Sequence, residues 1–425
     1  MSQIKMPTVT VSMPRLAEGF ADGFITVLPD QTDCTAELVT VYWADKAGQR
    51  LADYDYLVHA RTDGFSFEID DKDIIISTSY APTGKPTVLP IPRGRVVPKG
   101  AVGLLVEVGA AEAAYVPLPE EPVYLDLGKK AFEFQIMSDL HLNSDRTTIA
   151  CTHTVATFED IIAEAHDSVG LMMCGDMTNH GWDEDFDILN ALVAEAEGLP
   201  PVTYLIGNHD FGHALPDPDN PPYKNFFGEG PLYFDRWISG CHHIFLAFDG
   251  VGWRRPIPDE EVAWLREKLA EDADPTKPIF VYCHEPIHNT VAGSTDAGHW
   301  WGIENGEEVG KILAAYPQAI FFTGHTHWEF ASLDEIYYAD ERMCNGVNIP
   351  CVKELGTPLN RPTADRLTGS EAVFVEVYEN GNVLIRGRHT LNHQWVGDYL
   401  IGERERNAGS EGNAEYGENE EYAAF

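Results

Sequence analysis

The chain has 425 residues, more than one hydrophobic core usually fills, so two or more domains are expected. Hydrophobic residues make up 44% of the chain and charged residues 23%, which is ordinary globular usage and excludes a largely disordered protein. The formal net charge of -39 opposes extended contact with a nucleic-acid polymer or an anionic membrane surface. Small anions stay compatible with this charge if bound cations reverse the potential locally.

The seven cysteines are odd in number, widely spaced and mostly set in apolar runs, unlike a disulfide framework or a zinc knot. They are therefore predicted to be reduced and buried. Residues 1–21 lack the basic start and continuous apolar stretch that export needs, and no later run reaches membrane-spanning length. These features predict a cytoplasmic protein without a membrane partner.

Residues 1–128 are predicted to form a β-rich domain. Short runs of strand-forming residues, such as Gly23–Leu28 and Leu38–Trp43, are separated by Gly, Pro and Asp, and no helical period competes with them. This pattern is typical of a small antiparallel sandwich of the fibronectin or immunoglobulin kind. The proline-rich segment Pro117–Pro122 has the composition of a stiff connector, so the boundary is placed near Gly128.

Residues 129–402 are predicted to form a layered α/β domain, because apolar strand-like runs alternate with helical segments. The predicted strands are Phe134–Met137, Gly170–Cys174, Val202–Ile206, Ile244–Phe248, Ile279–Cys283 and Ala319–Phe322. The predicted helices are Phe158–Ala165, Phe186–Ala196, Asp259–Glu271 and Glu307–Ala315. Two further strands are expected within Ala372–Arg388, joined at Asn380-Gly381. Residues 403–425 form an acidic tail that is predicted to be mobile.

The clearest helical signal lies in Asp259–Glu271. Asp259 is a residue type that caps the first turn of a helix, and Val262, Leu265 and Leu269 share one face at helical spacing. An amphipathic helix with one buried stripe is therefore expected here.

Five of the six predicted strands are followed at once by residues that commonly bind metals. These endings are Ser138-Asp139-Leu140-His141, Gly175-Asp176, Gly207-Asn208-His209-Asp210, His284 and Gly324-His325-Thr326-His327. Because loops at the carboxyl ends of strands in α/β sheets meet in one crevice, these side chains are expected to lie together. Imidazole and carboxylate ligands suit zinc, manganese or iron better than calcium, and the lack of thiolates argues against a structural zinc site.

In this order the five endings resemble those of the calcineurin-like metallophosphoesterases, over about residues 132–330. The resemblance implies a core of two packed mixed sheets flanked by helices, in the layer order α/β/β/α. It also implies two divalent or trivalent transition-metal ions, of manganese, iron or zinc. One ion would be held by Asp139, His141, Asp176 and His327, and the other by Asp176, Asn208, His284 and His325.

The resemblance further implies a catalytic role for His209, which matches the family's histidine that donates a proton or hydrogen bond to the leaving oxygen. Asp210 follows it and is expected to orient the imidazole. Two cations about 3.5–4 Å apart would lower the pKa of a bridging water, so that hydroxide attacks the phosphoryl group in line. These features predict hydrolysis of a small phosphodiester or phosphomonoester, with a cyclic nucleotide as one candidate substrate.

The resemblance does not extend to the redox-active site of the purple acid phosphatases. That group also has a leading β-rich domain, but it has a metal-binding tyrosine where this chain has Asn179, and it lacks the histidine present here at position 141. An iron–tyrosinate site is therefore not expected.

Two other functions fit the sequence less well than a small-substrate hydrolase does. A nuclease would need a basic track, which the excess of 68 acidic over 29 basic residues opposes. A non-catalytic scaffold pinned by metals would have no use for His209, which this chain retains. Further candidate substrate contacts are His180, His288, His299 and Arg254-Arg255. The sequence leaves the oligomeric state open.

Overall fold

The structure is a computed structural model. It describes residues 8–28, 38–61, 63–69, 75–82, 87–108, 113–212, 221–248, 250, 255–271, 274–294, 302–332, 335–356 and 369–402. The predictions for Cys34, Arg254, His299 and the tail at 403–425 lie outside these residues.

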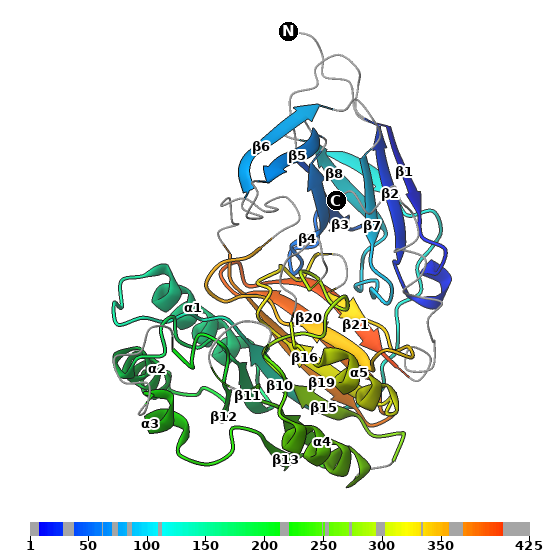
Figure 1. Cartoon of the computed structure of the whole chain (residues 1–425). Coiled ribbons are helices and arrows are strands. Elements are labelled where there is room, and N and C mark those ends of the chain that lie inside the picture. Colours follow the sequence, from blue (N-terminus) through cyan, green and yellow to red (C-terminus); the bar gives the residue numbers. More distant parts are fainter. Residues whose placement is uncertain are drawn as a thin grey trace.

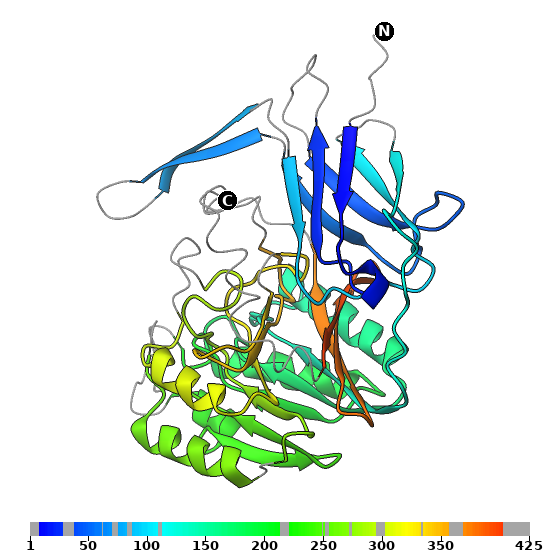
Figure 2. The same ribbon diagram turned by 90° about the vertical axis from the view of Figure 1, so that its right-hand side faces the viewer.

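The N-terminal region folds as two facing antiparallel sheets, as predicted. Their strand orders are β1-β2-β7 and β4-β3-β8-β9. The elements are β1 (Thr8–Ser12), the short 3-10 helix η1 (Leu16–Glu18), β2 (Gly23–Leu28), β3 (Leu38–Ala44), β4 (Tyr56–Arg61), β7 (Thr87–Ile91), β8 (Gly103–Val108) and β9 (Ala114–Pro117). Ile25, Val41 and Leu104 pack in the core between the sheets. A separate ribbon of β5 (Asp63–Ile69) and β6 (Ile75–Pro82) extends to one side in Figure 2.

Two six-stranded mixed sheets build the larger part of the described chain. Their orders are β12-β11-β10-β19-β20-β21 and β13-β14-β15-β16-β18-β17. The first contains β10 (Lys130–Met137), β11 (Ser168–Cys174), β12 (Val202–Leu205), β19 (Glu371–Tyr378), β20 (Val383–His389) and β21 (Gln394–Ile401). The second contains β13 (Phe234–Ile238), β14 (Cys241–Phe245), β15 (Ile279–Tyr282), β16 (Ala319–Thr323), β17 (Ile336–Tyr337) and β18 (Asn345–Asn348). Strands β10, β11 and β12 run parallel, as do β14, β15, β16 and β18, so their carboxyl ends lie on one edge of each sheet.

A buried core fills the space between the two sheets, and helices cover the outer faces (Figure 1). Phe134 of β10 packs edge-on against Phe280 of β15, with ring centroids 5.0 Å apart. Phe158 and Leu189 lie in the core outside the first sheet, and Leu265 lies in the core outside the second. The helices are α1 (Ile149–Glu164), α2 (Asp183–Glu195), α3 (Tyr223–Phe227), α4 (Asp259–Glu271) and α5 (Gly306–Ala314). The expected α/β/β/α layering is confirmed.

Helix α4 has the predicted bounds, but α1 begins at Ile149 rather than at Phe158. The first turns of α1 contain several threonines, which are weak helix formers. Here the Thr154 hydroxyl donates to the carbonyl of Ala150 at 2.8 Å, so this side chain is satisfied inside the helix. None of the helices in the described part of the chain is long and apolar enough to cross a membrane.

Strand β14 begins at Cys241, ahead of the predicted run that starts at Ile244. The sequence concealed this start because two histidines follow Cys241, and both are buried in the structure. The ring of His243 meets the hydroxyl of Tyr282 at 2.9 Å, which offsets the cost of burying it.

The N-terminal region packs against β21 of the first large sheet. Arg95 is only 1% exposed, and its guanidinium donates to the Tyr399 hydroxyl at 3.0 Å and to the carbonyl of Val396. Backbone bridges join Tyr54 to Trp395 and Arg95 to Tyr399. The junction is therefore both buried and hydrogen-bonded.

Candidate metal centre

The predicted ligand residues lie in loops that leave five parallel strands. Asp139 and His141 follow β10, Asp176 follows β11 and Asn208 follows β12. His284 follows β15, and His325 and His327 follow β16. The first three strands belong to one sheet and the last two to the other. The site therefore lies where the carboxyl ends of both sheets meet, and it needs the two sheets to be packed.

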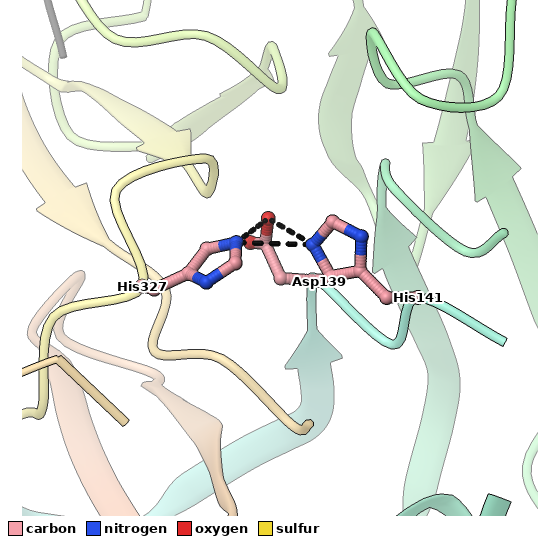
Figure 3. A group of neighbouring side chains, drawn as sticks. All are labelled: Asp139, His141 and His327. Atoms are coloured by element: carbon pink, nitrogen blue, oxygen red, sulfur yellow. Dashed lines mark hydrogen bonds and ion pairs between the residues drawn. The ribbon is translucent and has the colours of Figure 1, made fainter. Parts of the chain in front are cut away.

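The first group of candidate ligands comprises Asp139, His141 and His327. Oδ1 of Asp139 lies 3.1 Å from Nε2 of His327 and 3.7 Å from Nε2 of His141. The two imidazole nitrogens are 3.0 Å apart. Figure 3 shows the carboxylate lying between the two rings. Potential ligand atoms on these residues lie within 4.8 Å of one another, close enough to share an ion.

The second group comprises Asp176, His284 and His325, whose potential ligand atoms also lie within 4.8 Å of one another. Oδ2 of Asp176 is 3.2 Å from Nε2 of His284 and 3.9 Å from Nε2 of His141. Asp176 therefore reaches both groups, as a bridging carboxylate would. Asn208 is 2% exposed.

The backbone at these positions is unusual. Five candidate ligands have positive φ although none is glycine: Asp139 (58°), His141 (46°), Asp176 (49°), His325 (71°) and His327 (62°). Such conformations cost of order 1–3 kcal/mol each and persist only where the surroundings impose them. These residues lie in three loops around one site. The surrounding structure therefore holds a strained backbone there, and this backbone directs the side chains toward the site.

Two glycines of the sequence pattern allow the loops to approach closely. A Cβ on Gly207 would lie 2.2 Å from the nitrogen of Asp176, and one on Gly324 would lie 2.0 Å from Oγ of Ser138. At Gly324 it would also lie 2.7 Å from Oδ2 of Asp139. Any side chain at either position would therefore displace a candidate ligand.

Backbone groups hold the ligand side chains from behind. Oδ2 of Asp139 accepts from the N–H of His325 at 2.9 Å, and Oδ1 of Asp176 accepts from the N–H of His209 at 2.8 Å. Nδ1 of His284 lies 2.8 Å from the carbonyl of Cys174, and a carbonyl only accepts, so Nδ1 carries the hydrogen. Nε2 of His284 is then the atom available to a metal.

Burial and charge oppose each other strongly in this site. Burial raises the pKa of Asp139, but the imidazoles of His327 and His284 hold it well below its usual range. Burial lowers the pKa of His141 to about 4. It acts the same way on His284, yet the carboxylates of Asp176 and Asp139 raise the pKa of that imidazole to about 10. The buried carboxylates thus favour positive charge at Nε2 of His284.

The residues present fit metal ions on a second ground. Buried ligand-type atoms without a hydrogen-bond partner among the described residues include Oδ1 of Asp139, Oδ1 of Asn208 and Nε2 of His284. These atoms belong to residues of the loops described above, and their mixed oxygen and nitrogen character matches the donor set of zinc, manganese or iron.

His209 and Asp210 are each held by contacts with neighbouring loops. Nδ1 of His209 lies 2.9 Å from the carbonyl of Asn179, so that carbonyl orients the ring. Asp210 instead binds the neighbouring loops. Its carboxylate accepts from the N–H groups of Gly207 at 2.9 Å, Thr178 at 2.8 Å and Met177 at 3.3 Å, and from the Thr178 hydroxyl at 2.8 Å. The orienting role of Asp210 stays a prediction, and the contacts of its oxygens are with backbone and hydroxyl donors of the neighbouring loops.

Two contributors escaped the sequence reasoning. The carbonyl of Asn179 has no residue-type signature, so no pattern could have revealed it. Cys351 lies beside the site, where its thiol contacts the carbonyl of Asp139 at 3.1 Å. Its burial, like that of the other described cysteines, was predicted and is confirmed, and none of them forms a disulfide. Of the further candidate substrate contacts, His180 and His288 are partly buried and Arg255 is exposed.

The match to a known protein family covers every loop of this site. Residues 133–329 match the family model described as calcineurin-like phosphoesterase. A purple acid phosphatase from yellow lupin seeds is 13% identical with a TM-score of 0.47, and the match covers 94% of this chain and 75% of that one. A 5′-nucleotidase precursor from Thermus thermophilus is 11% identical with a TM-score of 0.31, covering 63% and 53%. The sulfate thiohydrolase SoxB from Thermus thermophilus is 12% identical with a TM-score of 0.31, covering 64% and 59%. A comparison with curated proteins gave no match.

Proposed function

The chain belongs to the calcineurin-like metallophosphoesterase superfamily through residues 133–329, and we propose that it hydrolyses a small phosphodiester or phosphomonoester with two metal ions. The ions are manganese, iron or zinc. We also propose the division into a β-rich domain at 1–128, the phosphoesterase domain at 129–402 and a tail at 403–425.

One observation carries this proposal. Two groups of buried carboxylate and imidazole side chains lie side by side, and Asp176 reaches both of them. A third set of potential ligand atoms within 4.8 Å, on His141, Asp176 and the half-buried His209, overlaps the two groups. A structural role for histidines would not require two groups with a shared carboxylate, whereas a dinuclear site does. The first ion is assigned to Asp139, His141, Asp176 and His327, and the second to Asp176, Asn208, His284 and His325.

When bound, two such ions act as Lewis acids that lower the pKa of coordinated water and neutralise charge on phosphoryl oxygens. The chain's own contribution is to hold these ligands on strained, buried loops, so that little reorganisation is needed during reaction. Burial of every assigned ligand also keeps bulk water from competing with the substrate.

His209 is assigned as the proton donor to the leaving oxygen. It is only half-buried, unlike the metal ligands, so its ring can meet a substrate that enters from solvent. Because Nδ1–H is committed to the carbonyl of Asn179, the other ring nitrogen, Nε2, is the atom that exchanges a proton with the leaving group. The ring of His141 lies against it, with centroids 4.6 Å apart.

The test combines metal analysis with an activity screen on p-nitrophenyl phosphate, its bis ester and cyclic nucleotides. Two ions per chain and turnover of at least one ester are expected, with loss of turnover on chelation. Asp176→Asn should lower the metal content, because this residue serves both ions. Full metal loading without turnover of any ester would favour a non-catalytic scaffold and overturn the proposal.

Asp235→Asn is a matched control for the metal count. Asp235, His242 and Glu271 also form a group with metal-ligand geometry, away from the loops described above. Nζ of Lys268 already lies 3.2 Å from Asp235 and 2.9 Å from Glu271, so a cation is in place there. This variant should therefore bind two ions as the wild type does.

A further inference from the structure

An exposed aromatic pair lies in the loop between β11 and α2. The rings of His180 and Trp182 are stacked, with centroids 4.5 Å apart and an interplanar angle of 21°. Trp182 is 40% exposed, and the side chain of His180 is 38% exposed. Among the described residues Trp182 stacks on no other ring, so the indole keeps surface available for a second planar group.

The pair is held rigidly without any ligand. The backbone N–H and Nδ1 of His180 both meet Oδ2 of Asp185, at 3.2 and 3.1 Å, and this aspartate is fully buried. Nε2 of His180 lies 2.9 Å from the side-chain amide of Asn179. Both ring nitrogens are therefore engaged, which fixes the plane on which Trp182 stacks. A surface ordered in advance binds a flat ligand at a lower entropic cost.

The pair adjoins the end of the site that opens to solvent. Asn179, next to His180, also holds the His209 ring through its carbonyl at 2.9 Å. His209 is the half-buried member of the site and the residue assigned above to the leaving oxygen. His180 and Trp182 therefore lie within three residues of the carbonyl that holds the His209 ring, beside the solvent-facing member of the site.

We propose that His180 and Trp182 form a stacking platform for a planar aromatic ring, such as a purine, carried by the leaving group of the substrate. This inference rests on the proposed function and narrows its substrate class. Stacking on an indole needs no positive charge, which suits a chain whose formal net charge is -39. Base stacking on aromatic side chains is worth about 5- to 150-fold in binding.

The matched test compares adenosine 5′-monophosphate with ribose 5-phosphate, which share the leaving alkoxide and differ in the base. Trp182→Ala in the metal-loaded protein should lower kcat/KM for the nucleotide about 5- to 150-fold and leave that for the sugar phosphate within about twofold. Trp182→Phe should restore most of the loss because it keeps a flat ring. An equal loss on both substrates, or no loss on the nucleotide, overturns the platform.

Trp237→Ala supplies the control. Trp237 is 49% exposed and stacks on His242 with centroids 4.5 Å apart, but it lies on β13, outside the five loops of the site. In this variant kcat/KM should be unchanged for both substrates. If the wild type hydrolyses neither compound, the proposed hydrolysis of this ester class is rejected. Calorimetric measurement of the binding of the same two compounds then tests the platform separately. Tighter binding of the nucleotide, lost in Trp182→Ala, supports it, and equal binding of both compounds overturns it.

Discussion

The phenol of Tyr56, in the N-terminal β-rich region, donates a hydrogen bond to the carboxylate of Glu329, two residues after the candidate ligand His327. The N–H of Glu329 in turn donates to the carbonyl of Gly356 at 2.8 Å, and the N–H of Gly356 donates to the carbonyl of His327 at 2.5 Å. Burial, with Glu329 beside it, raises the pKa of Tyr56 well above its usual range, so the phenol remains a donor. The N-terminal region therefore contacts the segment that carries the last metal ligands.

Tyr56→Phe should weaken metal binding, because it releases one anchor of the segment that aims His327. Loss of groups that support metal ligands typically lowers metal affinity about 10- to 100-fold, and the low end is expected at this distance. Calorimetric titration of both proteins with Mn²⁺ or Zn²⁺ measures the change in metal affinity.

Tyr54→Phe is the matched control for that change. Tyr54 also donates to a carboxylate across the same junction, that of Asp398 at 2.5 Å, but Asp398 lies in β21, away from the metal loops. Its loss should lower thermal stability and leave metal affinity unchanged. Equal effects of the two variants on metal affinity would show that the junction acts only through stability.

His209→Ala should lower kcat about 10²–10⁴-fold while two ions remain bound, since it removes a proton donor and no assigned ligand. Steady-state kinetics and metal analysis on the same sample separate the two effects. Loss of metal in this variant would mean that His209 is a ligand.

Asp210→Asn should act differently from its neighbour. The carboxylate accepts four hydrogen bonds from the loops after β11 and β12, and an amide would turn N–H groups toward some of these donors. A fall in melting temperature, accompanied by partial loss of metal, is expected. A fully stable variant with lowered kcat would instead support the predicted catalytic role of Asp210.

Gly324→Ala should abolish metal binding at the first group while the fold persists. Its Cβ would meet Oγ of Ser138 at 2.0 Å and Oδ2 of Asp139 at 2.7 Å, so the aspartate has to move. Far-ultraviolet circular dichroism should be unchanged, and metal analysis should show fewer than two ions. An unaltered metal content would mean that the loop relaxes away from Asp139.

The buried carboxyl of Glu261 should make the stability of the protein depend on pH, independently of the metals. It is 1% exposed, its Oε1 accepts from the N–H of Ala247 at 2.7 Å, and burial raises its pKa from 4.5 to about 8. The folded form keeps the proton that the unfolded chain loses above pH 4.5. The contribution of Glu261 to the free energy of unfolding is therefore largest below pH 4.5. It decreases by roughly 1.4 kcal/mol per pH unit up to about pH 8 and is constant above that pH.

Glu261→Gln keeps the acceptor oxygen and removes the titration. Urea denaturation at pH 5, 6.5 and 8 should show the variant gaining on the wild type as the pH rises. A difference between the two proteins that does not change with pH would contradict the assigned pKa.

The sequence by itself determined the layered class, the N-terminal sheets and the order of the candidate ligands. Asp259, with apolar residues at 262, 265 and 269, defined α4 because capping and a helical stripe are local properties. Strand endings such as Gly324-His325-Thr326-His327 were visible because each lies within a few residues of its own strand.

Only the tertiary structure decided which groups meet. The carbonyl of Asn179 orients His209, the Asp210 carboxylate ties two loops, and Tyr56 reaches Glu329 across 273 positions of the chain. A backbone carbonyl has the same chemistry in every residue, and a contact over that separation depends on how two sheets and a sandwich pack. Local sequence patterns contain neither kind of information, because both are set by the position of one element relative to another.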